Sequence, residues 1–258
     1  MADNLFEIKN LSFSYDKDNV IDDLSLTIKP GGVTTIIGAN GCGKSTLFNL
    51  MTKNLKYYKG EIKFLGEDVS KIKLRALAKK LAIVHQQNTI PFDITVEKLV
   101  GYGRIPYENL CIPSKQEDNE DKIIWAMSVT GVYDIKGELL SRLSGGQRQR
   151  AWIAMSLAQD TDTLLLDEPT TFLDIKHQIE ILKLIENLNK EHGISIIMVL
   201  HDMNQAMRYS TEVIALKDGK NIAQGSPESV ISEEILKKLY GVDLDIVEVN
   251  GKPFVYMA

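Results

Sequence analysis

The stretch Gly38–Thr46, with the sequence GANGCGKST, holds the residue types that bind a phosphate chain. It matches the pattern G-x-x-x-x-G-K-S/T of the phosphate-binding P-loop. The glycines let the backbone turn its N–H groups inward around an anion, and the N-terminus of a following helix adds partial positive charge. Lys44 can reach the β- and γ-phosphates of a nucleotide, and the Ser45 hydroxyl can hold Mg²⁺. The stretch therefore predicts a nucleotide-binding loop.

The residues on either side of this loop supply the setting that the motif requires. Val33–Ile37, with the sequence VTTII, is typical of a buried β-strand. Leu47, Phe48 and Met51 fall on one face of a helix that would follow the loop. Strand, glycine loop and helix in this order favour phosphate binding over the alternative, a glycine-rich turn that binds nothing.

Two adjacent carboxylates form a second candidate for chemistry. Thr163–Leu166 is a continuous apolar run, as expected of a parallel strand buried on both faces, and it ends in Asp167 and Glu168. The carboxyl ends of such strands are where α/β sheets place their ligands. Because successive strand residues point in opposite directions, Asp167 can face Mg²⁺ while Glu168 faces the attacking water. The alternative is a solvated pair of acids in a loop.

Two single polar residues also follow predicted strands. Gln86 comes after the short buried strand predicted at 81–84, and His201 comes after the buried strand predicted at 193–200. A lone histidine is often structural, so both interpretations of His201 stay open. Its place beside the other strand ends favours a functional role.

A second glycine turn and one aromatic ring each allow two interpretations. Leu143–Gln147, LSGGQ, precedes a helix with small apolar residues over 151–158. This turn is either a second anion-binding helix N-terminus or an ordinary N-cap, and it has no lysine–serine pair of its own. Tyr15 stands just before a turn predicted at 16–19, between antiparallel strands expected over 5–28. Its ring either stacks on a purine or covers the outer face of the sheet.

The remaining elements follow from periodicity and turn residues. We expect strands over 60–64, 213–216 and 221–223, helices over 75–80, 95–99 and 121–130, a break at 101–107, a helix reaching about residue 190, helices opened by Ser226 and Ser232, and a strand-like tail over 246–256.

The order of these elements predicts an α/β fold with a mostly parallel sheet and an antiparallel N-terminal part. The helix-rich segment 88–160 lies between two strand-rich segments, 1–87 and 161–258. We therefore expect one domain, 1–258, in which 88–160 is an inserted helical subdomain of a nucleotide-binding core.

Composition limits the class of protein. The chain has 258 residues, 44% of them apolar, and a net charge of −5, so we expect no nucleic-acid partner. The two cysteines, Cys42 and Cys111, do not form a disulfide framework and fit a reducing cytosol. We expect neither a signal peptide nor a membrane-spanning segment, so membrane association would need a partner.

The ordered motifs resemble the ATP-binding subunit of an ABC transporter over nearly the whole chain. The resemblance rests on the P-loop, Gln86, the signature LSGGQ at 143–147, the Asp167–Glu168 strand end, Leu173–Asp174 and His201. It implies a P-loop NTPase core of the ABC type that uses ATP and Mg²⁺ and hydrolyses ATP. His85 departs from the pattern, because relatives commonly have proline there.

The resemblance also implies a role for each matching position. For ATP binding these are Tyr15 at the adenine, Val20 beside the ribose, and Gly38, Ala39, Asn40, Gly41, Cys42, Gly43, Lys44, Ser45 and Thr46 at the phosphates. For Mg²⁺ they are Ser45, Gln86 and Asp167. For catalysis they are Glu168 as general base, His201 at the γ-phosphate, and Gln86.

The signature is implied to serve a second copy of the chain. Ser144, Gly145, Gly146 and Gln147 would contact ATP bound to the other subunit, and Asp174 would lie at the dimer interface. The residues themselves agree, because one chain carries two anion cradles and one lysine–serine–carboxylate set. A head-to-tail pair related by a two-fold axis would complete two sites.

A finer resemblance, carried by 100–107, 157–161 and 173–175, is to importers of iron–siderophore, haem and cobalamin complexes. It implies transmembrane permease subunits, an extracytoplasmic substrate-binding protein and a place on the cytoplasmic face of the membrane. We place iron(III)–siderophore first; haem, cobalamin or a metal ion are the alternatives. A soluble ABC-type switch ATPase is the competing class, although the chain lacks sustained heptads.

Overall fold

The computed structural model describes residues 3–86, 88, 93–108, 116–249 and 252–256. The chain forms two compact units, which we describe separately. The first consists of Met1–Ile72 and Ser195–Ala258, and the second of Lys73–Ile194. The predicted boundaries of the inserted subdomain, 88–160, remain a prediction.

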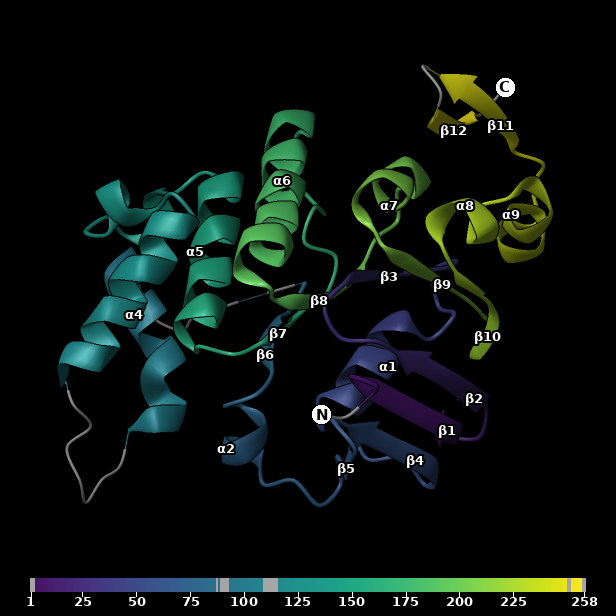
Figure 1. Cartoon of the computed structure of the whole chain (residues 1–258), viewed down its shortest axis with the longest axis horizontal. Coiled ribbons are helices and arrows are strands. Elements are labelled where there is room, and N and C mark those ends of the chain that lie inside the picture. The colour runs from purple at the N-terminus through teal and green to yellow at the C-terminus, as the bar shows by residue number, and fades with distance from the viewer. Residues whose placement is uncertain (1–2, 87, 89–92, 109–115, 250–251, 257–258) are drawn as a thin grey trace. The chain divides into compact units, whose positions relative to one another are not determined.

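Parallel strands form the centre of the first unit (Figure 1). β3 (Val33–Ile37) pairs in parallel with β8 (Ser195–Val199) and with β9 (Glu212–Lys217). β9 turns back into antiparallel β10 (Lys220–Gly225). Every residue of β3 and β8 is buried, which explains why their sequences are continuously apolar or small.

An antiparallel sheet of order β2-β1-β4-β5 completes this unit's strand-rich N-terminal part. Its members are β1 (Phe6–Ser14), β2 (Asn19–Ile28), β4 (Lys59–Phe64) and β5 (Glu67–Asp68). The apolar residues Phe6, Ile8, Leu11 and Phe13 of β1 are buried, and the Phe6 and Phe64 rings of paired strands lie 4.8 Å apart. The predicted antiparallel strands are confirmed, with the turn between β1 and β2 where the polar residues stand.

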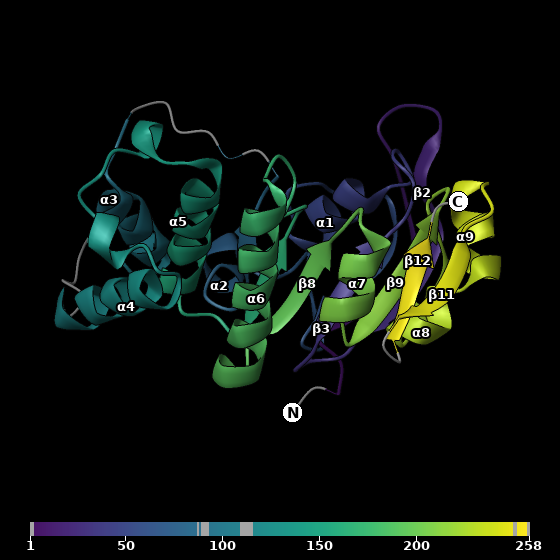
Figure 2. The same cartoon turned by 90° about the horizontal axis from the view of Figure 1, so that it is seen from above.

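Short helices follow several strands of the first unit. α1 (Lys44–Met51) comes directly after the P-loop, and α7 (Met203–Tyr209) follows β8. α8 (Pro227–Val230) and α9 (Glu233–Tyr240) come after β10. Figure 2 shows α7 beside the terminal strand β12 (Lys252–Tyr256), which pairs with β11 (Asp245–Val249).

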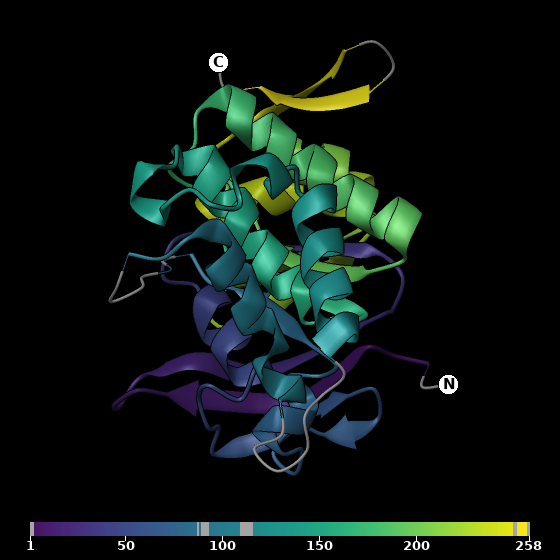
Figure 3. The same ribbon diagram turned by 90° about the vertical axis from the view of Figure 1, so that its left-hand side faces the viewer.

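The second unit is mainly helical. β6 (Ala82–Val84) and β7 (Thr163–Leu166) pair in parallel. Figure 3 shows the unit's helices from another side. They are α2 (Leu74–Leu77), α3 (Val96–Gly101), α4 (Gln116–Val129), α5 (Gly145–Ala158), α6 (Ile175–His192) and the 3-10 helices η1 (Tyr102–Tyr107), η2 (Tyr133–Ile135) and η3 (Leu140–Arg142). α3 and α4 both pack on α5.

One prediction about this helical unit is confirmed and one was wrong. The α-helix α3 ends at Gly101, as the expected break at 101–107 requires, and the segment after it is the 3-10 helix η1, whose glycine serves packing: a Cβ on Gly103 would lie 2.2 Å from the Met155 carbonyl oxygen of α5. Helix α4 begins at Gln116, five positions before the expected start at Asp121. Its acidic start resembled a loop, but acidic residues near a helix N-terminus interact favourably with the helix dipole.

Smaller differences concern the tail and two caps. The predicted single strand-like tail is two paired strands, β11 and β12, in which Ile246 and Val255 face each other in an antiparallel register. Ser232 caps α9 through its side chain as predicted, whereas Ser226 stands at the N-cap of α8 without a side-chain bond. Within the described residues, no helix combines the length and apolar character needed to span a membrane.

Candidate active site

The P-loop takes a backbone path that only glycine fits at two of its positions. Gly38 and Gly43 have φ angles of 154° and 104°, a region that L side chains rarely adopt. A Cβ on Gly38 would lie 2.3 Å from the Leu216 carbonyl oxygen, and one on Gly43 would lie 2.9 Å from the Val20 carbonyl oxygen. The loop between β3 and α1 is therefore tightly packed from behind, with Asn40 and Gly41 exposed on its other side.

Lys44 turns its ammonium group back into the loop. Its Nζ donates hydrogen bonds to the carbonyl oxygens of Gly38, at 2.8 Å, and of Ala39, at 2.9 Å. The Cys42 thiol is buried within 4.0 Å of the same ammonium. Burial raises the pKa of this thiol, so the neutral form is favoured.

The start of α1 presents hydroxyl groups beside an aromatic ring. Ser45 is exposed, whereas Thr46 is buried and its Oγ1 lies 3.4 Å from the Tyr15 hydroxyl. The Tyr15 ring is 61% exposed and meets Phe13 edge-on. Most of the Tyr15 side chain is thus accessible, as stacking on a purine would require, while Val20 is half-buried.

His201 lies at the end of a strand next to the P-loop strand. β8 and β3 are parallel neighbours, and the Leu200 backbone donates to the Ile36 carbonyl at 3.3 Å. His201 is exposed, and Asp202 after it caps α7 by accepting from two backbone N–H groups. The structure thus confirms that His201 lies at the same edge of the sheet as the P-loop.

In the second unit, Gln86 and Glu168 contact each other. They follow the parallel strands β6 and β7, and the Gln86 Nε2 donates to the Glu168 Oε2 at 2.6 Å. The Thr171 hydroxyl donates to the same oxygen at 3.0 Å. Glu168 has a φ of 52°, a strained conformation for a non-glycine residue that often marks a functional position. Asp167, by contrast, is buried and bonds through its backbone to Val84.

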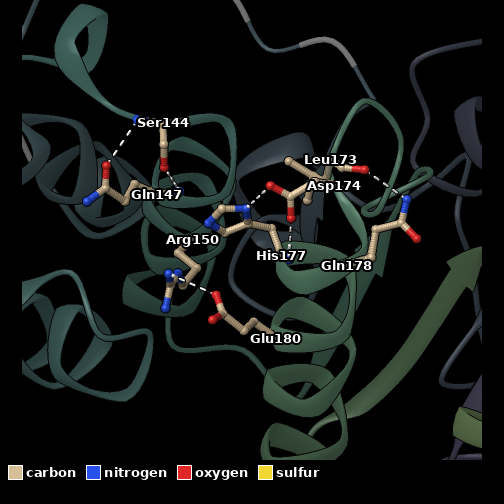
Figure 4. A network of polar contacts seen from close by, with 8 residues as sticks. All are labelled: Ser144, Gln147, Arg150, Leu173, Asp174, His177, Gln178 and Glu180. Carbon is tan, nitrogen blue, oxygen red and sulfur yellow. Dashed lines mark hydrogen bonds and ion pairs between the residues drawn. The ribbon is translucent and has the colours of Figure 1, made fainter.

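Figure 4 shows the signature turn and the start of α6 close together. Ser144 and Gln147 form a capping box at the start of α5: the Ser144 hydroxyl accepts from the Gln147 backbone, and the Gln147 side chain accepts from the Ser144 backbone. The N-cap interpretation is therefore correct as geometry, and a capped helix start still offers N–H groups to an anion. Asp174 caps α6, and bonds from His177 hold its pKa below the usual value.

Sequence reasoning missed three residues at these sites. Thr171 fixes Glu168, and His177 lies between Asp174 and the signature. Tyr240 of α9 contacts the P-loop backbone at Gly38, and burial raises its pKa to about 12. No local sequence pattern predicts the role of Tyr240, because its partner Gly38 lies far away in the sequence. The contact between Asp174 and His177 did have a signal in the sequence, because the two residues are three positions apart on one helical turn.

Comparison with known proteins decides the family. The ABC transporter family model matches residues 21–171, more than half of the chain. The ferric enterobactin transport ATP-binding protein FepC of Escherichia coli is 42% identical over 96% of this chain and 92% of its own length. The chain belongs to the ABC transporter family.

Two further similarities concern this ABC ATPase. It is 42% identical to the iron(3+)-hydroxamate import ATP-binding protein FhuC of Bacillus subtilis, over 95% of this chain and 90% of the relative. It is also similar to a dimeric bacterial ABC transporter cassette, with a TM-score of 0.75 and 28% identity over 86% of this chain and 98% of that one. The predicted α/β cassette fold and the assignment as an ATP-hydrolysing transport ATPase are thus confirmed, whereas the roles of single residues remain predictions.

Proposed function

We propose that this ABC ATPase drives the import of an iron(III)–siderophore complex. The observation that carries the proposal is its 42% identity, along nearly the whole chain, to two relatives named for ferric enterobactin transport and iron(3+)-hydroxamate import. Haem, cobalamin or a metal ion would use the same kind of motor, so cargo is the first property to test.

In this proposal the first unit holds the nucleotide. Tyr15 stacks on the adenine, Val20 packs beside the ribose, and the P-loop amides surround the phosphates. Support comes from the exposure of Tyr15 and from Gly38 and Gly43, where close backbone atoms leave no room for a side chain. Lys44 would exchange its bonds to loop carbonyls for bonds to phosphate oxygens, which carry more negative charge.

Ser45, Gln86 and Asp167 would hold Mg²⁺, which neutralises charge on the phosphates. Their hydroxyl, amide and carboxylate oxygens are the donors that Mg²⁺ prefers. Gln86 donates through its Nε2, which leaves its Oε1 as the ligating atom. Among the described residues no three His, Cys, Asp or Glu side chains gather as a metal site.

Glu168 would accept a proton from the attacking water. Gln86 and Thr171 both donate to its Oε2, which holds the carboxylate in one orientation. His201 would contact the γ-phosphate from the end of β8. A general base of this kind contributes about 10²–10⁴-fold to a rate.

The working form would be a homodimer on a membrane permease. Ser144, Gly145, Gly146 and Gln147 would contact ATP held by the partner subunit, with Asp174 at the interface. The similarity to a dimeric cassette supports this arrangement. Permease subunits would place the protein on the cytoplasmic face of the membrane, with an extracytoplasmic substrate-binding protein delivering the cargo.

The test is uptake into proteoliposomes that contain the permease and this ATPase. We expect ATP-dependent accumulation of a ferric siderophore, and none with the variant Glu168→Gln in the same vesicles. Uptake of haem, cobalamin or a free metal ion, without uptake of the ferric siderophore, would show that the proposed cargo is wrong. Failure of the ATPase to co-purify with any permease would favour the soluble switch ATPase.

A further inference from the structure

The start of α6 holds a carboxylate in one orientation through a single neighbour. Asp174 Oδ1 accepts from the His177 backbone N–H at 2.9 Å, and Asp174 Oδ2 lies 2.8 Å from the His177 Nδ1. An ionised carboxylate only accepts, so Nδ1 carries the hydrogen. Because both oxygens bond to the same residue, the carboxylate cannot turn without breaking a bond. The neighbouring Leu173 carbonyl is held in the same way by the Gln178 side chain, at 2.9 Å.

The same imidazole packs against the signature turn. A Cβ on Gly146 would lie 2.3 Å from His177 Cδ2 and 2.7 Å from its Cγ, so the ring occupies the place of any side chain there. Gly146 is helical and has no need of glycine for its backbone angles. The neighbouring His177 ring leaves no room for a side chain at this position, and Figure 4 shows the ring between the two helix starts.

Two further contacts, one on each side of the His177 ring, join the start of α5 to the start of α6. A Cβ on Gly145 would lie 3.2 Å from Leu173 Cδ2, so this pair is also close. One turn further along the helices, Arg150 Nη2 of α5 pairs with Glu180 Oε2 of α6 at 3.3 Å. The signature turn and the Leu173–Asp174 turn therefore pack against each other, with His177 at the centre.

We propose that His177 is a positioning residue that joins the signature turn to the Leu173–Asp174 turn, so that both meet a second copy of the chain in a fixed relative orientation. The inference rests on the proposed function, in which both turns face the partner subunit. His177 touches neither nucleotide nor water in this scheme. Its hydrogen bond sets the Asp174 carboxylate, and its ring sets the distance to Gly146.

The first test separates the hydrogen bond from the bulk of the side chain. His177→Asn keeps a donor close to the position of Nδ1, whereas His177→Leu keeps bulk without a donor. Both are made in the Glu168→Gln background, and the dimer dissociation constant with ATP is measured by sedimentation. We expect His177→Leu to weaken the dimer about tenfold and His177→Asn less than about threefold, because a hydrogen bond to a charged group is lost only in the first. ATP affinity of the monomer stays unchanged in both.

The second test uses the contact with Gly146. Gly146→Ala places a methyl group on the His177 ring and should weaken the dimer at least as much as His177→Leu. Adding His177→Ala removes the ring, so the double variant should return to the level of His177→Ala alone. Gly137→Ala is the matched control in the same unit, because a Cβ there meets nothing within 4 Å.

The outcomes distinguish this inference from the proposed function. Equal dimer affinity in His177→Asn and His177→Leu, or no recovery in the double variant, would overturn the role of His177 alone. Absence of any ATP-dependent dimer in Glu168→Gln with His177 intact would overturn the proposed function and this inference together. Thermal midpoints of all variants show whether the monomers are folded, and the steric test holds even if His177→Leu is unstable.

Discussion

At the scale of single residues, Glu168 is the side chain on which the proposed chemistry depends most. Replacing it by glutamine keeps size and shape but removes the proton acceptor, so we expect ATPase activity to fall by about 10²–10⁴-fold. ATP affinity should change little, whereas Lys44→Ala should lose it. The measurements are phosphate release and binding of a fluorescent nucleotide.

A matched control for Glu168→Gln is Glu186→Gln on α6. Glu186 pairs with Lys190 at 2.7 Å on the surface, and such pairs contribute little. The control should keep normal activity. Near-normal activity in Glu168→Gln itself would show that another group takes the proton.

The Cys42 thiol gives a pH-dependent prediction at the same scale. Its pKa is raised by burial, so its thiolate is scarcer at pH 8 than that of a free cysteine. In a Cys111→Ser background, labelling by N-ethylmaleimide should be slow at pH 7 and should rise about tenfold per pH unit. Stability from the buried neutral thiol is present below the unfolded pKa and is lost as pH rises through the folded one.

The consequence of labelling Cys42 tests the packing of the P-loop. The thiol is buried within 4.0 Å of the Lys44 ammonium, so added bulk should disturb the phosphate cradle. We expect prior MgATP to protect the thiol and labelled protein to lose nucleotide binding. Mass spectrometry measures the extent of labelling. Full ATP affinity in completely labelled protein would contradict the predicted loss of nucleotide binding.

At the scale of elements, two serine N-caps form a natural comparison. Ser144 caps α5 and Ser232 caps α9, and both side chains accept from a backbone N–H of the first turn. Each change to alanine should cost about 1 kcal/mol of stability by thermal or denaturant unfolding. Only Ser144→Ala should also weaken ATP-dependent dimerisation, because only α5 begins at the signature. Equal dimerisation in the two variants would contradict a role for the signature hydroxyl.

At the scale of the whole molecule, the proposed partner is a permease. The 3-10 helix η1 exposes Ile105, which is 55% exposed, and such an apolar side chain suits a protein contact. With Cys111→Ser as background, Ile105→Cys should cross-link to the permease in membranes. Ile222→Cys on β10 is the control and should not. Cross-links from residue 222 alone would place the permease contact elsewhere.

The parts that could be predicted from sequence are those whose physics is local. The P-loop follows from glycine, lysine and serine at fixed spacing, β3 and β7 from short runs rich in β-branched and apolar residues, and the cap of α9 from one serine. Each depends on a few consecutive residues. The start of α4 was mispredicted because acidic residues suit both loops and helix N-termini, and local composition cannot separate the two.

Contacts between distant segments were decided by the tertiary structure. Gln86 and Glu168 are 82 positions apart, and only the parallel pairing of β6 with β7 brings them to one edge. The Gly146 backbone could accept a side chain, yet the His177 ring fills that space. The amino-acid sequence establishes which chemical groups this ABC ATPase carries and in what order. Packing determined which groups touch, because a side chain's neighbours depend on how separate elements meet.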